Sequence, residues 1–260
     1  MQKRLSFLIL FNLSLLIPCI ATAHFGMVIP SKNIVTPDNK SISLTLSFSH
    51  PFEGIGMPLK KPAAFYVVKD NEKMDLTNSL EKTSVMEHLA WKTTYPVKRP
   101  GIYQFVMEPN PYWEPSEDRF IIHYTKTIIP AFGIDDGWDS PAGTPVEIVP
   151  LLRPFGNYTG NTFTGRVLQH GQPVANIEVE VEFYNQQQQY SAASDYHITQ
   201  LIKTDDNGIF NFTCTRPGWW GFAALSTADY LLKSPKGQEK PVEIGAVLWI
   251  FMDSLSSSKK

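Results

Sequence analysis

The sequence predicts an all-β protein built from two β-sandwich domains. Short runs of β-branched and aromatic residues alternate with turn signals along most of the chain, and the 20 prolines and 16 glycines fall mostly between these runs. Helical periodicity is scarce, and Lys82 to Ala90 is the best short candidate for a helix. With 43% apolar and 12% aromatic residues, the chain has enough apolar side chains to fill sandwich cores.

The first 23 residues have the pattern of a cleaved signal peptide. Lys3 and Arg4 form a basic start, an apolar run extends from Leu5 to Ile20, and Ala21-Thr22-Ala23 is an A-x-A cleavage site. Cleavage after Ala23 makes His24 the first residue of the mature chain. We therefore expect an exported protein, secreted through this signal peptide.

Composition limits which cellular compartment and which binding partners are expected for this protein. Loss of the two basic signal residues changes the net charge from −2 to −4, and no basic stripe suits nucleic acid. Of the two cysteines, Cys19 lies in the signal, so Cys214 has no internal disulfide partner and is expected in the core. Export without a disulfide is typical of proteins of the bacterial periplasm, so we expect a periplasmic location. We also expect a monomer.

The first domain is predicted over residues 24–130. Ser41 to Phe48 alternates polar and apolar residues as a half-buried strand does, and Ala64 to Val68 follows the same pattern. The turn Arg99-Pro100-Gly101 leads into a strand from Ile102 to Met107, and Arg119 to Thr127 is a further strand. Turn-forming residues around 128–150 mark the boundary.

The second domain is predicted over residues 131–260. The strand Thr162 to Leu168, a G-x-P-V turn and the strand Ile177 to Phe183 precede a T-D-x-x-G-x-F turn and the segment Pro217 to Trp220. This order resembles the transthyretin-like or carboxypeptidase-regulatory β-sandwich, a module that implies a support or interaction role. The apolar run Ile244 to Met252 is too short to span a membrane and predicts a buried final strand.

Three histidines are candidate metal ligands. At the mature N-terminus, His24 would offer both an α-amine and an imidazole, which together can chelate one transition metal ion. His50 closes a predicted strand and His123 lies within one, a position that is also typical of a hydrogen-bonded core residue. Together they would form a nitrogen-rich site suited to nickel, copper, cobalt or zinc, with Glu53 as an oxygen ligand or as a residue that fixes an imidazole tautomer.

No motif in the sequence indicates catalysis. The nucleophile elbow G-x-S-x-G, the zinc motif H-E-x-x-H and a phosphate-binding glycine loop do not occur. The acidic, aromatic segment Tyr112 to Asp118 is interpreted either as a cover for a site or as a solvated loop. We therefore expect a binding protein, not an enzyme.

Five segments carry a resemblance to one family. They are His24 to Ser31, His50 to Gly54, Pro111 to Lys126, Pro145 to Leu151 and Pro217 to Leu225. With these segments the mature chain resembles the periplasmic component family associated with bacterial nickel/cobalt uptake transporters. The resemblance implies capture of Ni²⁺ or Co²⁺ and delivery to a membrane transporter of the energy-coupling type.

By position, the resemblance also implies ligand roles for His24, His50 and His123, with Glu53 as a weaker candidate. Two other readings stay open at this point. An N-terminal histidine beside a second histidine is similar to the copper-binding histidine brace of carriers and oxidative enzymes, for which Cu²⁺ is the metal. The third is a metal-free β-sandwich that binds protein or sugar.

Overall fold

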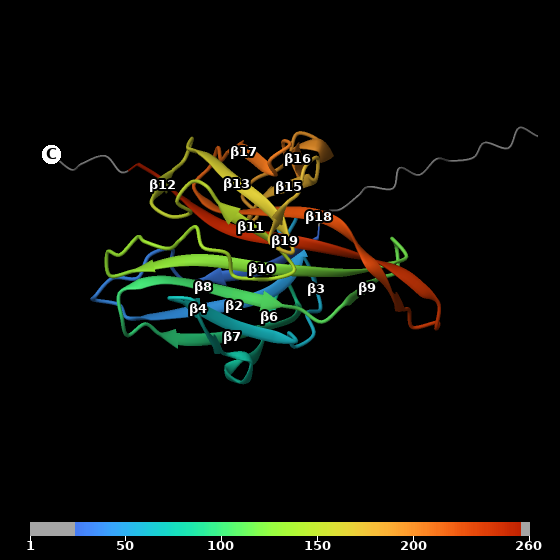
Figure 1. The fold of residues 1–260 in the computed structure, drawn as a ribbon, viewed down its shortest axis with the longest axis horizontal. Coiled ribbons are helices and arrows are strands. Elements are labelled where there is room, and N and C mark those ends of the chain that lie inside the picture. Colours follow the sequence, from blue (N-terminus) through green and yellow to red (C-terminus); the bar gives the residue numbers. More distant parts are fainter. Residues whose placement is uncertain (1–23, 256–260) are drawn as a thin grey trace, which may run out of the picture.

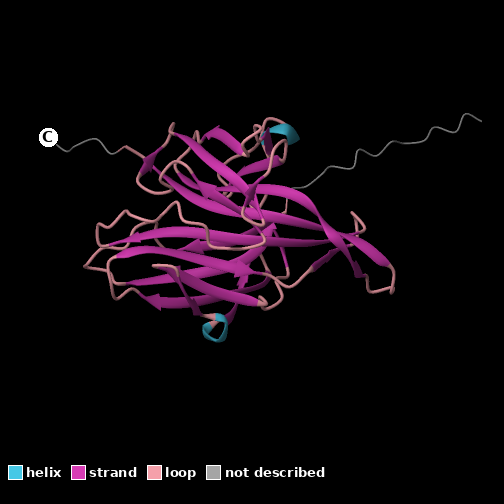
Figure 2. Cartoon of the chain, viewed as in Figure 1, coloured by secondary structure: helices cyan, strands magenta, loops and turns pink. Residues whose placement is uncertain are grey.

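The chain is almost entirely β-structure. The computed structural model describes residues 24–255, and the predicted signal peptide lies outside them. Within that range the helical elements are two short 3₁₀ turns, η1 (Thr77–Ser79) and η2 (Asp195–His197), seen in Figure 2. None of the helices in the described part is long and apolar enough to cross a membrane. The prediction of an all-β sandwich protein is confirmed.

The strands between residues 24 and 255 form three sheets. The five-stranded sheet contains β1 (Phe25–Pro30), β2 (Ser41–His50), β3 (Ile55–Met57), β6 (Glu81–Val85) and β7 (His88–Pro96). The ten-stranded sheet contains β4 (Ala64–Lys69), β5 (Glu72–Asp75), β8 (Gly101–Glu108), β9 (Tyr112–Glu114), β10 (Arg119–Ala131), β12 (Asn157–Tyr158), β15 (Glu178–Phe183), β16 (Gln200–Lys203), β18 (Gly218–Lys233) and β19 (Glu239–Asp253). The four-stranded sheet contains β11 (Val146–Pro150), β13 (Thr162–Gln169), β14 (Gln172–Pro173) and β17 (Ile209–Thr213).

The ten-stranded sheet is the middle layer of the molecule, with one smaller sheet on each face (Figure 1). Strand β19 illustrates this arrangement. Successive side chains of a strand point to opposite faces of its sheet, so β19 contributes to the cores on both sides. Val247 and Trp249 lie in the core shared with the five-stranded sheet, whereas Leu248 and Ile250 lie in the core shared with the four-stranded sheet. A strand buried on both faces reads as a continuous apolar run, as the sequence predicted for Ile244 to Met252.

Strand β10 joins the two halves of the chain. It pairs antiparallel with β8 and parallel with β19, in a register that runs from Phe120 opposite Val242 to Thr127 opposite Trp249. The predicted boundary at residue 130 therefore falls at the end of a strand that belongs to both halves. The division into residues 24–130 and 131–260 stays a prediction, and the two halves share one hydrogen-bonded sheet.

A buried ion pair fastens the middle layer to the four-stranded sheet. Lys126 Nζ on β10 donates to Glu147 Oε2 on β11 at 2.8 Å, and both side chains are almost fully buried. Glu147 also accepts backbone N–H groups from Ala142 and Gly143. Burial lowers the pKa of Lys126, and the Glu147 carboxylate opposes that shift.

One sequence prediction was wrong, and another is confirmed. Lys82 to Ala90 does not form a helix but the hairpin of β6 and β7. Its turn residues Met86 and Glu87 both have positive φ, 48° and 65°, a conformation that suits a two-residue hairpin turn and not a helix. Cys214 is fully buried, as predicted, and burial raises the pKa of its thiol.

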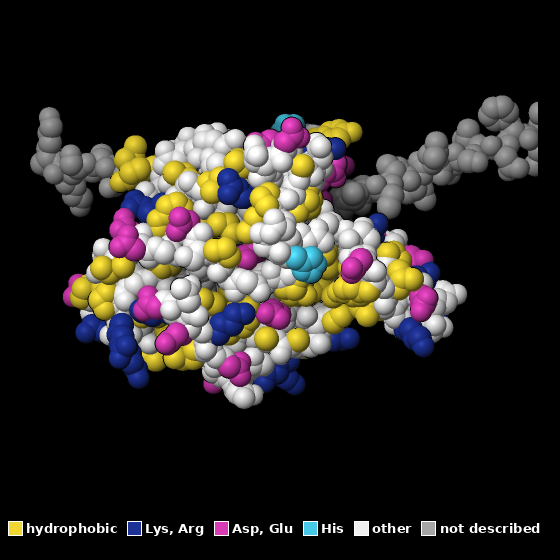
Figure 3. Space-filling view, viewed as in Figure 1, with side chains coloured by type: hydrophobic (Ala, Val, Ile, Leu, Met, Phe, Trp, Pro, Cys, Tyr) yellow, Lys and Arg dark blue, Asp and Glu magenta, His cyan; other side chains and the backbone are white. Residues whose placement is uncertain are grey.

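Charged side chains are dispersed over the surface. On the face seen in Figure 3, lysines and arginines lie interspersed with aspartates and glutamates. This mixture agrees with the nearly balanced formal charge of −2 for the whole chain. Nucleic-acid binding proteins typically concentrate basic side chains on one face instead.

Candidate functional site

Two glycines, Gly26 and Gly245, allow the backbone to lie close to His123 because they have no side chain. β1 crosses directly over β10 at Gly26, where an added Cβ would lie 2.2 Å from Thr125 Oγ1 and 3.2 Å from His123 Cβ. On β19, a Cβ at Gly245 would lie 2.5 Å from His123 Cδ2. Glycine is the residue that permits such close approach of two backbones or of a ring to a backbone. His24, two residues before Gly26, is therefore brought beside the middle sheet.

The three predicted histidines lie close together at this crossing. His24 precedes β1, His50 ends β2 and His123 lies in β10; they are 6%, 7% and 1% exposed. The rings of His24 and His50 have their centroids 4.7 Å apart. The ring of Phe48 contacts both His24 and His123, with centroid distances of 5.6 Å and 5.8 Å. Strand register explains why His24 lies beside His50, because Phe25 on β1 pairs with Ser49 on β2.

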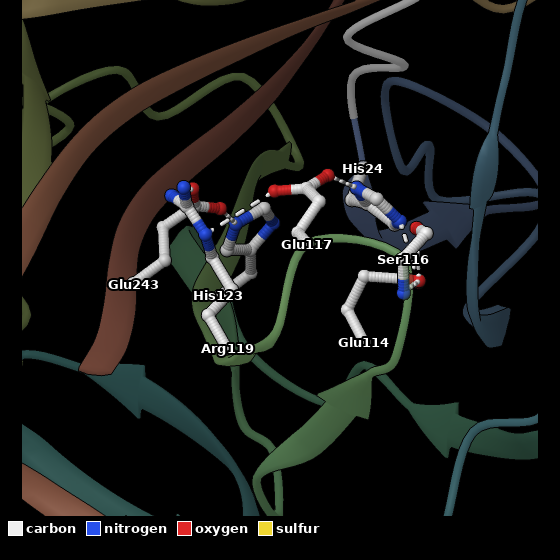
Figure 4. Close-up of polar contacts among 7 residues, drawn as sticks. All are labelled: His24, Glu114, Ser116, Glu117, Arg119, His123 and Glu243. Atoms are coloured by element: carbon white, nitrogen blue, oxygen red, sulfur yellow. Dashed lines mark hydrogen bonds and ion pairs between the residues drawn. The ribbon is translucent and has the colours of Figure 1, made fainter. Parts of the chain in front are cut away.

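Carboxylates surround two of the histidines (Figure 4). His24 Nε2 lies 3.3 Å from Glu114 Oε2, and His24 Nδ1 lies 3.7 Å from Glu117 Oε1. His123 Nε2 lies 3.3 Å from Glu243 Oε1. The turn between β9 and β10 thus lies against His24 through Glu117, while Pro115, Ser116 and Asp118 are exposed. Of the two interpretations of the segment Tyr112 to Asp118, the structure favours the cover.

One buried ring nitrogen lacks a partner. His123 Nδ1 is buried and neither donates nor accepts a hydrogen bond within residues 24–255. Buried polar atoms in folded proteins are nearly always hydrogen bonded, so an orphan of this kind calls for an explanation. Because Glu243 engages Nε2, Nδ1 is the ring atom of His123 that is left for a ligand.

Electrostatics keep His24 neutral. Burial, together with the nearby His50 and His123, lowers the pKa of His24 to about 4 against the opposing effect of Glu114 and Glu243. Burial raises the pKa of Glu114, but hydrogen bonds from Ser116 and the proximity of His24 outweigh it, so the pKa is lowered. At neutral pH the site therefore combines a neutral His24 imidazole with ionised Glu114.

The fourth predicted residue lies elsewhere. Glu53 is exposed and lines a surface hollow with Asn185 and Asp195, and it is not among the carboxylates that contact His24 and His123. The residues that sequence reasoning missed are Arg119 and Glu243. Arg119 Nη1 lies 3.1 Å from Glu243 Oε2. Glu243 is 120 residues from His123 in the chain, and only the parallel pairing of β10 with β19 places it there.

The side chains as they lie do not form a coordination sphere. Among residues 24–255, no group of three or more His, Cys, Asp or Glu side chains is arranged to hold a metal ion. Both ring nitrogens of His24 face carboxylates. A metal ion bound through His24 would replace its contact with Glu114 or Glu117.

A family model for a domain of unknown function, DUF4198, matches residues 21–228. The chain belongs to the DUF4198 family. The match extends across both halves of the molecule and includes His24, His50 and His123. No curated protein matches this DUF4198 chain significantly.

This DUF4198 protein resembles solved structures only weakly. The D0-D1 domain of intimin is 14% identical with a TM-score of 0.24, over 88% of this chain and 100% of the other. Latent PorU from Porphyromonas gingivalis is 11% identical (TM-score 0.24), and a Salmonella alpha-2-macroglobulin mutant is 10% identical (TM-score 0.27). The matches cover 86% and 87% of this chain but only 20% and 15% of those two.

Proposed function

We propose that this DUF4198 protein captures a transition metal ion, Ni²⁺ or Co²⁺, in the periplasm and delivers it to a membrane uptake transporter of the energy-coupling type. The ion is cargo, and His24, His50 and His123 are its ligands. Two observations carry the proposal. The buried rings of His24 and His50 lie 4.7 Å apart, and the buried His123, which contacts Phe48 as His24 does, has a ring nitrogen without a hydrogen-bond partner among residues 24–255.

The chemistry of the donors supports nickel or cobalt over calcium or magnesium. Neutral imidazole suits Ni²⁺, Co²⁺, Cu²⁺ and Zn²⁺, whereas Ca²⁺ and Mg²⁺ prefer oxygen ligands. Because the pKa of His24 is about 4, this imidazole binds a metal at neutral pH without first losing a proton. Glu243 orients His123 from behind, as carboxylates commonly orient metal-binding histidines.

The mature N-terminus would complete the donor set. If the signal peptide is removed after Ala23, the α-amine of His24 becomes a fourth nitrogen donor. The resemblance of the His24 to Ser31 and His50 to Gly54 segments to the nickel/cobalt transporter family supports both the metal and the partner. No catalytic step is part of this proposal.

The pairing of His24 with His50 supports copper as a second candidate. Their ring separation of 4.7 Å, with the Tyr112 ring 6.5 Å from that of His24, is compatible with a histidine brace at the mature N-terminus. A brace enzyme would reduce oxygen with copper and ascorbate. If the copper-loaded protein does not reduce oxygen, the copper alternative is a copper carrier and not an enzyme.

The test is calorimetry on exported protein whose N-terminus has been confirmed as His24 by mass spectrometry. Ni²⁺, Co²⁺, Cu²⁺ and Zn²⁺ are compared in wild type, His50→Ala, His123→Ala and a chain with one extra residue before His24. We expect each change to weaken Ni²⁺ or Co²⁺ binding by at least about 100-fold. His170→Asn is the matched control, because this exposed turn histidine has a φ of 49° that asparagine tolerates.

Wild-type affinity in both His50→Ala and His123→Ala would contradict the assigned ligands. Absence of binding for every metal would leave a β-sandwich interaction protein as the better description. Copper is expected to bind most tightly to almost any nitrogen site, so the decisive comparison is between variants for one metal.

A further inference from the structure

Arg119 connects the carboxylates that contact His24 and His123. Its Nη1 donates to Glu243 Oε2 at 3.1 Å. Its Nε lies 3.3 Å from Glu117 Oε2, which is close enough for an ion pair but not aligned for a hydrogen bond. Figure 4 shows Glu117 between the two histidines, with the Arg119 guanidinium beside Glu243 and His123. The side chain of Arg119 is 40% exposed, so it lies along the outer side of the cluster.

Without Arg119, the site would carry an excess of acidic oxygens. Glu114, Glu117 and Glu243 lie within ion-pair distance of a histidine. Grouped carboxylates are the ligands that Ca²⁺, Mg²⁺ and Mn²⁺ prefer. Two further contacts occupy Glu114, since Ser116 donates both its backbone N–H and its hydroxyl to Oε1. Arg119 occupies the other two carboxylates.

One nitrogen donor is not occupied in the same way. His123 Nδ1 is buried and has no hydrogen-bond partner in the described chain. A guanidinium is always protonated at physiological pH and has five N–H donors in a fixed fork, which matches carboxylate oxygens but leaves imidazole lone pairs free. The protein thus holds its oxygens in ion pairs while a ring nitrogen stays available.

We propose that Arg119 is a specificity-determining residue that excludes oxygen-seeking divalent cations from the histidine cluster. It does so by pairing with Glu117 and Glu243, so that a cation relying on those carboxylates must compete with a positive charge already in place. The inference rests on the proposed metal-binding function, because it assigns a selectivity device to that site.

The experiment compares Ca²⁺ and Mn²⁺ binding by calorimetry in wild type, Arg119→Gln and Arg119→Lys, each beginning at His24. We expect Arg119→Gln to bind Ca²⁺ and Mn²⁺ at least about tenfold more tightly than wild type, because one nearby positive charge is lost. Arg119→Lys retains the charge and should stay close to wild type. Arg153→Gln is the matched control, since Arg153 also pairs with a carboxylate, Asp135, on an exposed surface.

A triple variant locates the effect. Adding Glu117→Gln and Glu243→Gln to Arg119→Gln should remove the gained Ca²⁺ binding, because the gain depends on those oxygens. If Arg119→Gln does not fold, Arg119→Met removes the same charge with a different shape and is measured instead.

The inference is overturned if the charge-removing variant binds Ca²⁺ and Mn²⁺ no better than wild type. It is also overturned if Arg119→Lys gains as much as Arg119→Gln. The proposed function fails by a different result, namely wild-type protein that binds neither Ni²⁺ nor Co²⁺. The Ca²⁺ measurement does not depend on that outcome, so the two failures are distinguishable.

Discussion

A methyl group added at Gly26 should disturb both stability and the histidine cluster. In Gly26→Ala the new Cβ would lie 2.2 Å from Thr125 Oγ1, whereas ordinary contacts begin near 3.4 Å, so about 1.2 Å of separation must be created. Thr125 is fully buried and its hydroxyl donates to the carbonyl of His123 at 3.0 Å, so it has little room to yield. The strand β1 is also fixed by Trp249 Nε1, which donates to Gly26 O at 2.8 Å.

Overpacking of this kind costs roughly 1–3 kcal/mol. For a chain of this size we expect the melting temperature to fall by about 4–8 °C, taking about 2 kcal/mol as the central value. Because β1 positions His24, Ni²⁺ affinity should fall by about tenfold, the effect of displacing a ligand without removing it.

The assay is thermal and urea unfolding of Gly26→Ala, Thr125→Ala and the double variant. Thr125→Ala alone should cost about 1 kcal/mol for its lost hydrogen bond. In the Gly26→Ala background the same change should restore stability, because it removes the atom that the new methyl group meets. Additive losses in the double variant would refute the close approach of β1 to β10 as the cause.

Two further outcomes follow from buried charges. Burial raises the pKa of Glu182 to about 8, with hydrogen bonds from Thr199 and Phe52 N–H opposing the shift, so the folded state favours the neutral carboxyl. Stability should therefore fall as pH rises from about 4.5 to 8, by on the order of 5 kcal/mol at most. Glu182→Gln should reduce this loss, measured by unfolding at pH 5 and pH 9. An unchanged pH dependence would contradict the assignment. Lys126→Met should cost about 3 kcal/mol in urea unfolding, because it leaves the buried Glu147 carboxylate without its cation. The double variant Lys126→Met/Glu147→Gln should recover part of that loss. A Lys126→Met variant as stable as wild type would show that the ion pair contributes nothing.

Local patterns were sufficient to predict most of the strands. The alternation in Ser41 to Phe48 and the apolar run Ile244 to Met252 each correspond to a strand of the structure. The hairpin at Lys82 to Ala90 was misread because its turn residues, Met86 and Glu87, adopt positive φ without the glycine or asparagine that usually signals it. Propensity alone does not reveal such a turn.

The site was predictable only in part. His24, His50 and His123 were chosen for their chemistry, and the structure buries all three in one region. Their role as ligands stays a prediction. Glu53 was chosen for its nearness to His50 in the chain, but the turn after β2 directs it to the surface. Glu243 and Arg119 carried no signal, because they join the cluster through the pairing of β10 with β19, which no local pattern specifies.

That parallel pairing also has a consequence for how the chain folds. Residues 120–127 must find residues 242–249, so the middle sheet closes only after more than a hundred intervening residues have been arranged. Contacts of such sequence separation are slow to form, since loop closure must precede any gain from the contact. Because β19 supplies side chains to both cores, neither sandwich is complete before it docks. Until then two apolar faces stay open to aggregation, and a chaperone that shields unpaired strand edges would serve this protein during its assembly.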